Sequence, residues 1–157
     1  MNDTNMKGVL TELAVATSFM QHGFNVSIPL NPSARYDMIV DAFGGLFKVQ
    51  VKTAVPSEDG TGFTIEPTSV HKIQNTWIHR KYDINEIDLF ATIYDNNTYI
   101  IPCYEINNMR EAKFRTVPPK TAQTKNIRYA ENFKLDNVLA KWDEMICGND
   151  SIKIEQK

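Results

Sequence analysis

Two short strands joined by a tight turn, within residues 36–53, constrain the fold of this chain more than any other feature. Tyr36–Asp41 is rich in residues that favour strands, and a turn with two glycines follows it. Leu46–Thr53 then alternates apolar and polar residues, the period of a strand with one buried face. The face expected to be buried carries Phe47, Val49 and Val51. So short a turn predicts that the two strands are antiparallel neighbours in one sheet.

The rest of the chain supplies helices and further strands. An amphipathic helix is expected at residues 6–22, and Gly23 ends its pattern. Further strands are expected at residues 24–30, 63–66, 89–94 and 98–102. Helical segments are expected at residues 70–77, 104–110 and 130–147, and an irregular basic segment at 116–126. This order predicts an α/β (α+β) fold with a mixed central sheet flanked by helices.

The length of 157 residues suits a single domain, expected to span residues 1–157 with its core at about 6–135 and a frayed tail. No apolar run reaches the roughly 20 residues of a membrane span, and no secretory signal is visible. Cys103 and Cys147 form neither a CxxC motif nor a zinc-binding pattern. We therefore expect a cytoplasmic protein with no membrane partner.

Charge is segregated along the chain. Seventeen basic and nineteen acidic residues give a net charge of −2, which argues mildly against a dedicated DNA-binding protein. Residues 106–135, however, carry seven Lys or Arg and two acids, and residues 71–82 carry three and none. Phosphate binding depends on such local excess more than on the total. Solvated loops and faces remain the alternative explanation for these charges.

Four polar residues are expected to converge at one end of the sheet. Pairing about the short turn brings Asp37 near Gln50 and Lys52, which are two apart and share a face. Glu12 lies in the middle of the first helix, which packs on the same sheet. Carboxylate and amide oxygens suit a hard cation such as Mg²⁺, and a neighbouring lysine suits work on an attacking water.

Three of these residues also have an ordinary structural explanation. Asp37 suits the cap of a strand close to a turn, Lys52 suits a solvated strand position, and Glu12 suits an exposed helical position. The residue types and their spacing leave both explanations open.

The motifs together resemble the PD-(D/E)XK nuclease superfamily. They are Lys7-Gly8-x-x-x-Glu12-Leu13-Ala14, Gly23-Phe24, Arg35-Tyr36-Asp37 and Val49-Gln50-Val51-Lys52-Thr53. The resemblance covers roughly residues 6–135 and is strongest to the small branch that holds group I intron homing endonucleases. Archaeal-type Holliday junction resolvases resemble the chain more distantly.

The resemblance implies a restriction-endonuclease-like core and a role for each site residue. Asp37 would be the central metal ligand, Gln50 an amide ligand, and Val51 a ligand through its backbone carbonyl. Glu12 would hold the metal directly or through water, and Lys52 would orient the water or stabilise charge. The implied metal is Mg²⁺, with Mn²⁺ as a substitute. Gln50 departs from the family pattern, where an acid usually stands, so weaker metal binding is expected.

The resemblance also implies double-stranded DNA as substrate and a homo-oligomer, dimer or tetramer, matching a symmetric site. The expected DNA contacts are Lys7, Ser33, Arg35, Lys48, Lys72, Arg80, Lys81, Lys120 and Lys125. Trp77 is assigned to the core, with a DNA contact as the alternative. Cys103, Phe133 and Trp142 are also assigned to the core.

The expected function is a metal-dependent DNA endonuclease, most consistent with a homing-type, site-specific enzyme that leaves a 5′-phosphate. A Holliday junction resolvase is the first alternative. The second is a nuclease fold with weak or no catalysis that binds nucleic acid or protein, an alternative motivated by Gln50 and the negative net charge.

Overall fold

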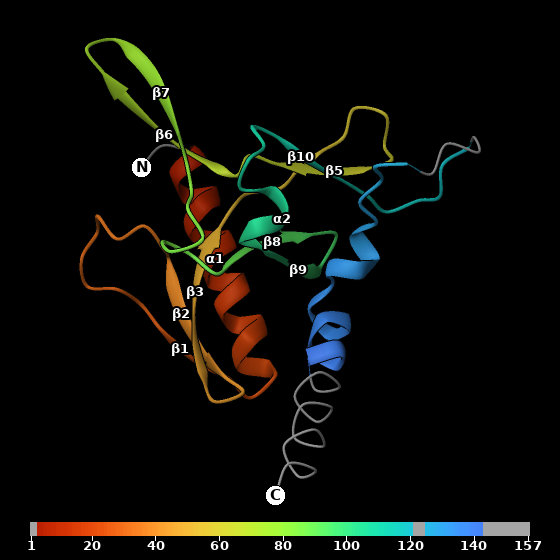
Figure 1. The fold of residues 1–157 in the computed structure, drawn as a ribbon, viewed down its shortest axis with the longest axis horizontal. Helices are drawn as coiled ribbons and strands as arrows, with labels where there is room; N and C mark the ends of the chain where they lie inside the picture. The colour runs from red at the N-terminus through yellow and green to blue at the C-terminus, as the bar shows by residue number, and fades with distance from the viewer. Residues whose placement is uncertain (1–2, 121–124, 143–157) are drawn as a thin grey trace, which may run out of the picture.

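A five-stranded mixed sheet forms the centre of the computed structural model, which describes residues 3–120 and 125–142 (Figure 1). Its strands, in spatial order, are β1 (Asn25–Ser27), β2 (Met38–Ala42), β3 (Gly45–Val51), β8 (Leu89–Tyr94) and β9 (Asn97–Pro102). Neighbours are antiparallel except β3 and β8, which are parallel. The predicted α+β class with a mixed sheet is confirmed.

The β2–β3 hairpin sets the register that the site depends on. Its turn, Phe43-Gly44, has positive φ at both residues (51° and 73°), the two-residue turn whose twist matches that of the strands. Met38 pairs with Val49, and the N–H of Asp37 donates to the carbonyl of Val49 at 2.9 Å. Asp37 therefore lies at the end of the hairpin away from its turn, as the sequence predicts.

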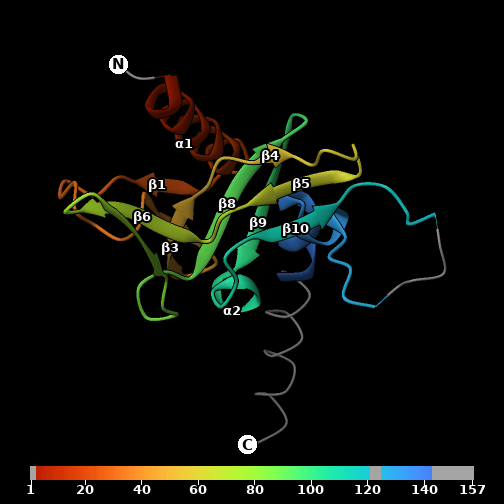
Figure 2. The ribbon, with the colours of Figure 1, turned by 90° about the horizontal axis from the view of Figure 1, so that it is seen from above.

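Helix α1 (Asp3–Gln21) covers one face of the sheet, and the shorter α2 (Cys103–Ile106) lies on the other side (Figure 2). Val15 and Phe19 of α1 are buried in one core cluster with the strands, and residues 135–142 pack into the same cluster. The side chains of His22 and Asp136 join the two helical segments at 2.6 Å.

A second core lies between the central sheet and a three-stranded sheet. This sheet contains β4 (Val55–Pro56), β5 (Gly62–Ile65) and β10 (Ala112–Arg115), in the order β10-β5-β4. Phe63 and Phe114 stack with ring centroids 5.3 Å apart, and both are fully buried beneath β8 and β9. Strand β5 is close to the strand predicted at residues 63–66, whereas no strand is predicted at β10.

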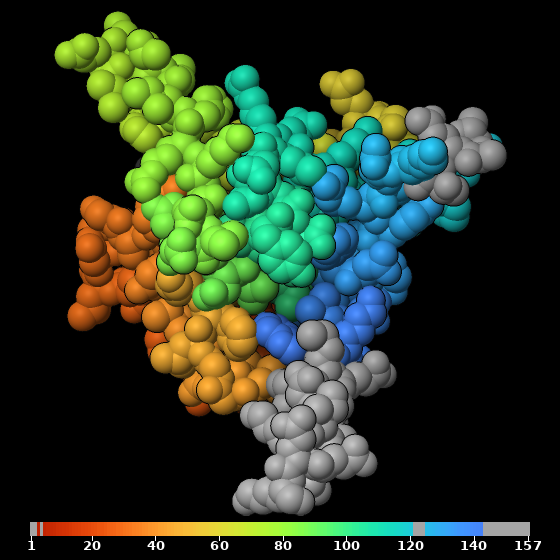
Figure 3. Space-filling view, viewed as in Figure 1, coloured from red at the N-terminus to blue at the C-terminus, as the bar shows by residue number. Residues whose placement is uncertain are grey.

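A ribbon of two strands, β6 (Thr68–Ile73) and β7 (Thr76–Lys81), projects from the body of the protein (Figure 3). The predicted helix at residues 70–77 is therefore wrong. The assignment of Trp77 to the core is also wrong, because this residue is 64% exposed on the ribbon. Both faces of the ribbon beyond its root are solvent-exposed, so no burial pattern marks its strands in the sequence.

The remaining helical predictions are partly correct. Residues 130–133 form a 3-10 turn, η1 (Ala130–Phe133), and α-helix follows at 135–142; residues 143–147 of the predicted helix lie outside the described part. The predicted turn at 104–110 is α2, which ends at Ile106. Cys103 is buried as predicted, and Phe133 and Trp142 pack against the cores while partly exposed. Within the described residues, no helix is both long and apolar enough to cross a membrane.

Candidate active site

Asp37 lies immediately before β2 and accepts two hydrogen bonds on one oxygen. The backbone N–H of Val51 donates to Oδ2 at 2.6 Å, and Nε2 of Gln50 donates to the same oxygen at 2.5 Å. The adjacent strand ends of the hairpin thus bring together Asp37, Gln50 and Val51, as the register requires. Charge-assisted hydrogen bonds of this kind hold a carboxylate in a fixed orientation.

Gln50 bridges two of the oxygens that the sequence analysis assigns to a metal. Its Nε2 donates to Oδ2 of Asp37 and also, at 3.2 Å, to the backbone carbonyl of Val51. These two oxygens therefore point toward one position, at which the electropositive amide hydrogens lie.

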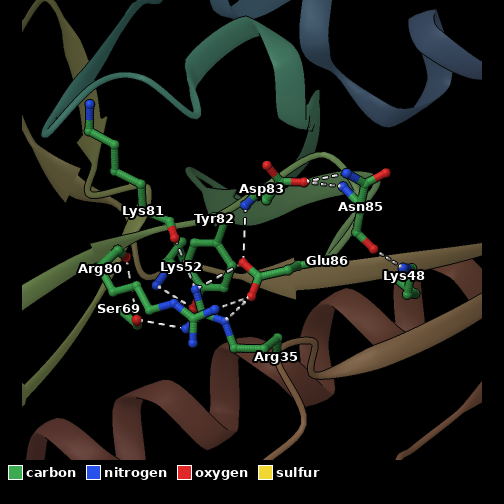
Figure 4. Close-up of polar contacts among 10 residues, drawn as sticks. All are labelled: Arg35, Lys48, Lys52, Ser69, Arg80, Lys81, Tyr82, Asp83, Asn85 and Glu86. Carbon is green, nitrogen blue, oxygen red and sulfur yellow. Dashed lines mark hydrogen bonds and ion pairs between the residues drawn. The ribbon is translucent and has the colours of Figure 1, made fainter.

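Lys52 directly follows β3 and reaches the root of the ribbon (Figure 4). Its Nζ donates to the carbonyl of Thr68 at 2.7 Å and to the hydroxyl of Tyr82 at 3.4 Å. Burial lowers the pKa of Lys52 to about 8, against the opposing effect of the Asp37 carboxylate. Burial thus brings the pKa of the Lys52 ammonium closer to neutrality, a kind of shift that is common at functional sites.

The two carboxyl groups of the cluster, those of Asp37 and Glu12, are partly buried. Burial raises the pKa of Asp37, although the Val51 N–H, Lys52 and Gln50 all act to lower it. Burial and then the charge of Asp37 raise the pKa of Glu12 on α1. Two partly buried carboxylates that repel each other gain from a cation between them.

This donor set fits a magnesium ion better than a transition metal. The described residues contain no group of three or more His, Cys, Asp or Glu arranged to hold a metal. The cluster instead offers two carboxylates, one amide and one backbone carbonyl. Mg²⁺ needs only one or two carboxylates because it keeps several of its waters. All four predicted ligands are oxygen-bearing groups, which is the chemistry this ion prefers.

The expected DNA contacts fall into two groups. Lys7, Ser33, Lys72, Lys120 and Lys125 are exposed. The other four are tied to the protein: Lys48 Nζ donates to Asn85 O (2.6 Å), Lys81 Nζ donates to Asn108 O (3.0 Å), Arg80 pairs with Glu86, and Arg35 is held by several partners.

Three residues around Lys52 are not predicted from the sequence to belong to the site. They are Thr68, Tyr82 and Glu86. Tyr82 is buried, its ring lies under Lys52 Nζ at 4.9 Å, and burial raises its pKa to about 12. None belongs to a recognisable motif. Only the tertiary fold, which returns residues 68–86 to the end of β3, brings them to the site.

An apolar hollow of about 490 Å³ lies away from this cluster, between β8, β9 and the helical residues 135–142. Its lining includes Leu89, Ile100 and Trp142. It offers none of the four clustered polar residues, so the chemistry of the protein is better sought at Asp37.

Several known proteins resemble this chain in sequence or in fold. The profile of the PD-(D/E)XK endonuclease family matches residues 2–136. Protein 5.3 of Escherichia phage T7 is 27% identical over 107 residues, which is 68% of this chain and 86% of that relative. The bacterial homing endonuclease I-Ssp6803I has a similar fold, with a TM-score of 0.70 and 19% identity, covering 97% of this chain and 99% of that one. Because the family profile spans most of its length, this chain belongs to the PD-(D/E)XK endonuclease family.

Proposed function

We propose that the chain is a metal-dependent endonuclease that cuts double-stranded DNA in the cytoplasm, of the homing, site-specific type. The observation that carries this proposal is the convergence of Asp37, Gln50 and the Val51 carbonyl beside Lys52 at the end of one hairpin. Family membership and the fold of I-Ssp6803I support the same reaction.

The residues of the cluster divide the chemistry. Glu12, Asp37, Gln50 and the Val51 carbonyl would hold Mg²⁺ or Mn²⁺, with the Gln50 amide turned to present its oxygen. A bound cation of this kind lowers the pKa of water and offsets negative charge on a phosphate. Lys52 supplies a positive charge near Asp37 and orients a water, and the neutral fraction that a pKa of about 8 leaves near neutral pH can accept a proton from that water. Cleavage leaves a 5′-phosphate.

The ribbon supports a duplex as substrate. A two-stranded β-ribbon fits the major groove of B-form DNA. Lys72, Arg80 and Lys81 give this ribbon positive charge, and the exposed Trp77 lies 5.7 Å from Lys72 Nζ. Phosphate contacts from such residues position a protein on DNA, whatever the sequence.

The proposal is tested by incubating the protein with Mg²⁺, a panel of long duplexes and a four-way junction, with EDTA as control. We expect cutting of one duplex site that EDTA abolishes. Preferred cutting of the junction would indicate a resolvase. Equal cutting of random duplex would contradict both roles.

A catalytically weak binding module remains the alternative that one observation favours. The Gln50 amide already donates hydrogen bonds to Asp37 Oδ2 and to the Val51 carbonyl. These two oxygens therefore have a partner in the protein without a metal ion. DNA binding at low salt without cutting of any substrate, with or without Mg²⁺, would support this alternative.

Gln50→Glu is expected to tighten Mg²⁺ binding by roughly tenfold, because a third carboxylate adds ligand charge. The same change should lower stability without metal, since the new charge repels Asp37. Isothermal titration calorimetry with Mg²⁺ measures the first effect and thermal unfolding the second. Gln21→Glu, on the exposed end of α1, is the matched control. Equal Mg²⁺ affinities in the wild type and Gln50→Glu would remove Gln50 from the ligands.

A homo-oligomer, dimer or tetramer, is part of the proposal because one active centre cuts one strand. The outward face of α1 supports it. Large apolar residues there are 41–60% exposed, and from residue 6 to residue 13 they follow the three- and four-residue spacing of a helix-pairing seam. They are Met6, Val9, Leu10, Leu13 and Met20. A self-complementary face of this kind suits a second copy of the chain.

Leu10→Glu is expected to convert the oligomer to a single chain, because it places a charge in the centre of this face. Size-exclusion chromatography with light scattering measures the mass. Tyr104→Glu, at a residue 70% exposed elsewhere, should leave the mass unchanged. A wild type that is monomeric at high concentration would contradict the oligomer.

A further inference from the structure

The β6–β7 ribbon is attached to the body of the protein at the same place where Lys52 lies. Lys52 Nζ contacts Thr68, the first residue of β6, and Tyr82, the residue that follows β7. The two contacts bracket the ribbon, because one is made at the first residue of its outgoing strand and the other directly after its returning strand. A displacement of the ribbon root therefore moves the groups that hold the Lys52 ammonium.

Arg35 ties both strands of the ribbon to this root (Figure 4). Its Nη1 donates to the hydroxyl of Ser69 on β6 at 2.7 Å, and its Nη2 donates to the carbonyl of Lys81 on β7 at 3.1 Å. Its guanidinium carbon stacks 4.1 Å from the centre of the Tyr82 ring. Arg35 thus binds both strands of the ribbon and stacks on Tyr82, whose hydroxyl contacts Lys52.

Glu86 anchors Arg35 from the body of the protein. Nε and Nη2 of Arg35 donate to its two carboxylate oxygens at 3.2 and 3.3 Å, and Arg80 of the ribbon pairs with the same carboxylate. With Ser69 and Lys81, these contacts use four of the five N–H donors of Arg35. A guanidinium so occupied has one donor left for a phosphate.

We propose that Arg35 is a positioning residue: it locks the root of the β6–β7 ribbon so that Thr68 and Tyr82 hold Lys52 in place for cleavage. The inference rests on the proposed function, since it assigns Lys52 to the reaction and the ribbon to DNA. This role differs from the DNA contact that is expected for Arg35 from the sequence. Engagement of the ribbon by DNA is then transmitted to the reaction centre through a chain of direct contacts.

The two roles of Arg35 predict different kinetics. A lost phosphate contact weakens binding to all DNA sequences and lowers the salt slope of log affinity by about 1. A lost positioning residue lowers the rate at saturating DNA, since misplacement by about 1 Å can cost 10²-fold. We therefore expect Arg35→Ala to cut the single-turnover rate constant by roughly 30- to 100-fold with DNA affinity and salt slope unchanged.

Companion variants sharpen the test. Arg35→Lys should fail to restore the rate, because one ammonium cannot make the forked contacts. Tyr82→Phe keeps the stacked ring, removes the hydroxyl near Lys52, and should lower the rate by a few-fold, about the loss expected for one weak hydrogen bond. Lys72→Ala should instead weaken binding to all DNA sequences and lower the salt slope, as expected for a lost phosphate contact. Arg110→Ala, at an exposed arginine that does not belong to the ribbon, is the charge-matched control.

A DNA-free measurement separates this inference from the proposed function. The side-chain NMR signal of Lys52 should shift in Arg35→Ala and stay in place in Arg110→Ala. An unchanged Lys52 signal, or a reduced salt slope with a normal saturating rate in Arg35→Ala, would overturn the positioning role. A wild type that cuts no DNA, while the Lys52 signal responds as expected, would count against the nuclease proposal and leave the coupling intact.

Discussion

Replacing Lys52 by alanine is expected to lower the rate of DNA cleavage by about 10³-fold, the effect typical of losing a group that transfers protons or stabilises charge in the transition state. The fold should not suffer. Burial lowers the pKa of Lys52 to about 8, so the folded protein holds the charged form less favourably than water does. Loss of activity without loss of stability is the expected signature of a residue kept for chemistry.

The measurement is single-turnover cleavage at saturating DNA, with thermal unfolding and DNA affinity recorded on the same samples. Asp37→Asn is the companion variant, because asparagine keeps an oxygen for the buried Val51 N–H, which Asp37 now accepts at 2.6 Å. Asp37→Ala would orphan that N–H, at a cost of about 1–3 kcal/mol, and confuse folding with catalysis. Cleavage by Lys52→Ala at the wild-type rate would exclude the proposed mechanism.

Gly62→Ala is expected to destabilise the protein by about 3 kcal/mol or more, because the new methyl group has nowhere to go. A Cβ there would lie 1.9 Å from the carbonyl oxygen of Phe114 and 3.0 Å from Cα of Arg115. Both contacts are to backbone, so no side-chain rotation relieves them. The pairing of β5 with β10 must open, and it carries the stacked rings of Phe63 and Phe114.

Gly8→Ala is the matched control for this prediction. Gly8 lies inside α1, and a Cβ there would meet nothing within 4 Å. The substitution should therefore stabilise the protein by about 0.5–1 kcal/mol through helix propensity. Urea unfolding of the wild type and both variants measures the two effects. Equal stability of Gly62→Ala and the wild type would show that β5 and β10 are not paired in solution.

The sequence predicts the β2–β3 hairpin and part of the candidate site. Residues 46–51 were predictable, since Val49 and Val51 bury one face and the two-residue turn fixes the register. That register alone brings Asp37 to Gln50. Glu12 comes close to this pair only because α1 packs on the sheet. The charge of Asp37 is one of the two causes that raise the pKa of Glu12.

The secondary-structure predictions fail where the local sequence pattern does not reflect burial. The β6–β7 ribbon has no buried face beyond its root, and its turn, Gln74-Asn75, has positive φ at both residues without a glycine. Neither periodicity nor turn chemistry therefore identified it. Strand β10 is short, and its alternation shows only in the burial of Ala112 and Phe114. The network of Arg35, which links residues far apart in the chain, has no sequence signal at all.

The single parallel pair of the central sheet bears on the order in which the protein folds. The β2–β3 hairpin closes through a two-residue turn, so Asp37 and Gln50 meet through contacts that are close in sequence. The pairing of Val49 with Leu89 instead requires the whole intervening chain, with β4 to β7, to close as one loop. Such closure carries a larger entropic cost and slows folding. We therefore expect Asp37 and Gln50 to meet early in folding. Lys52, whose N–H donates to the carbonyl of Ala91 on β8, is expected to gain its surroundings only when that distant strand pairs.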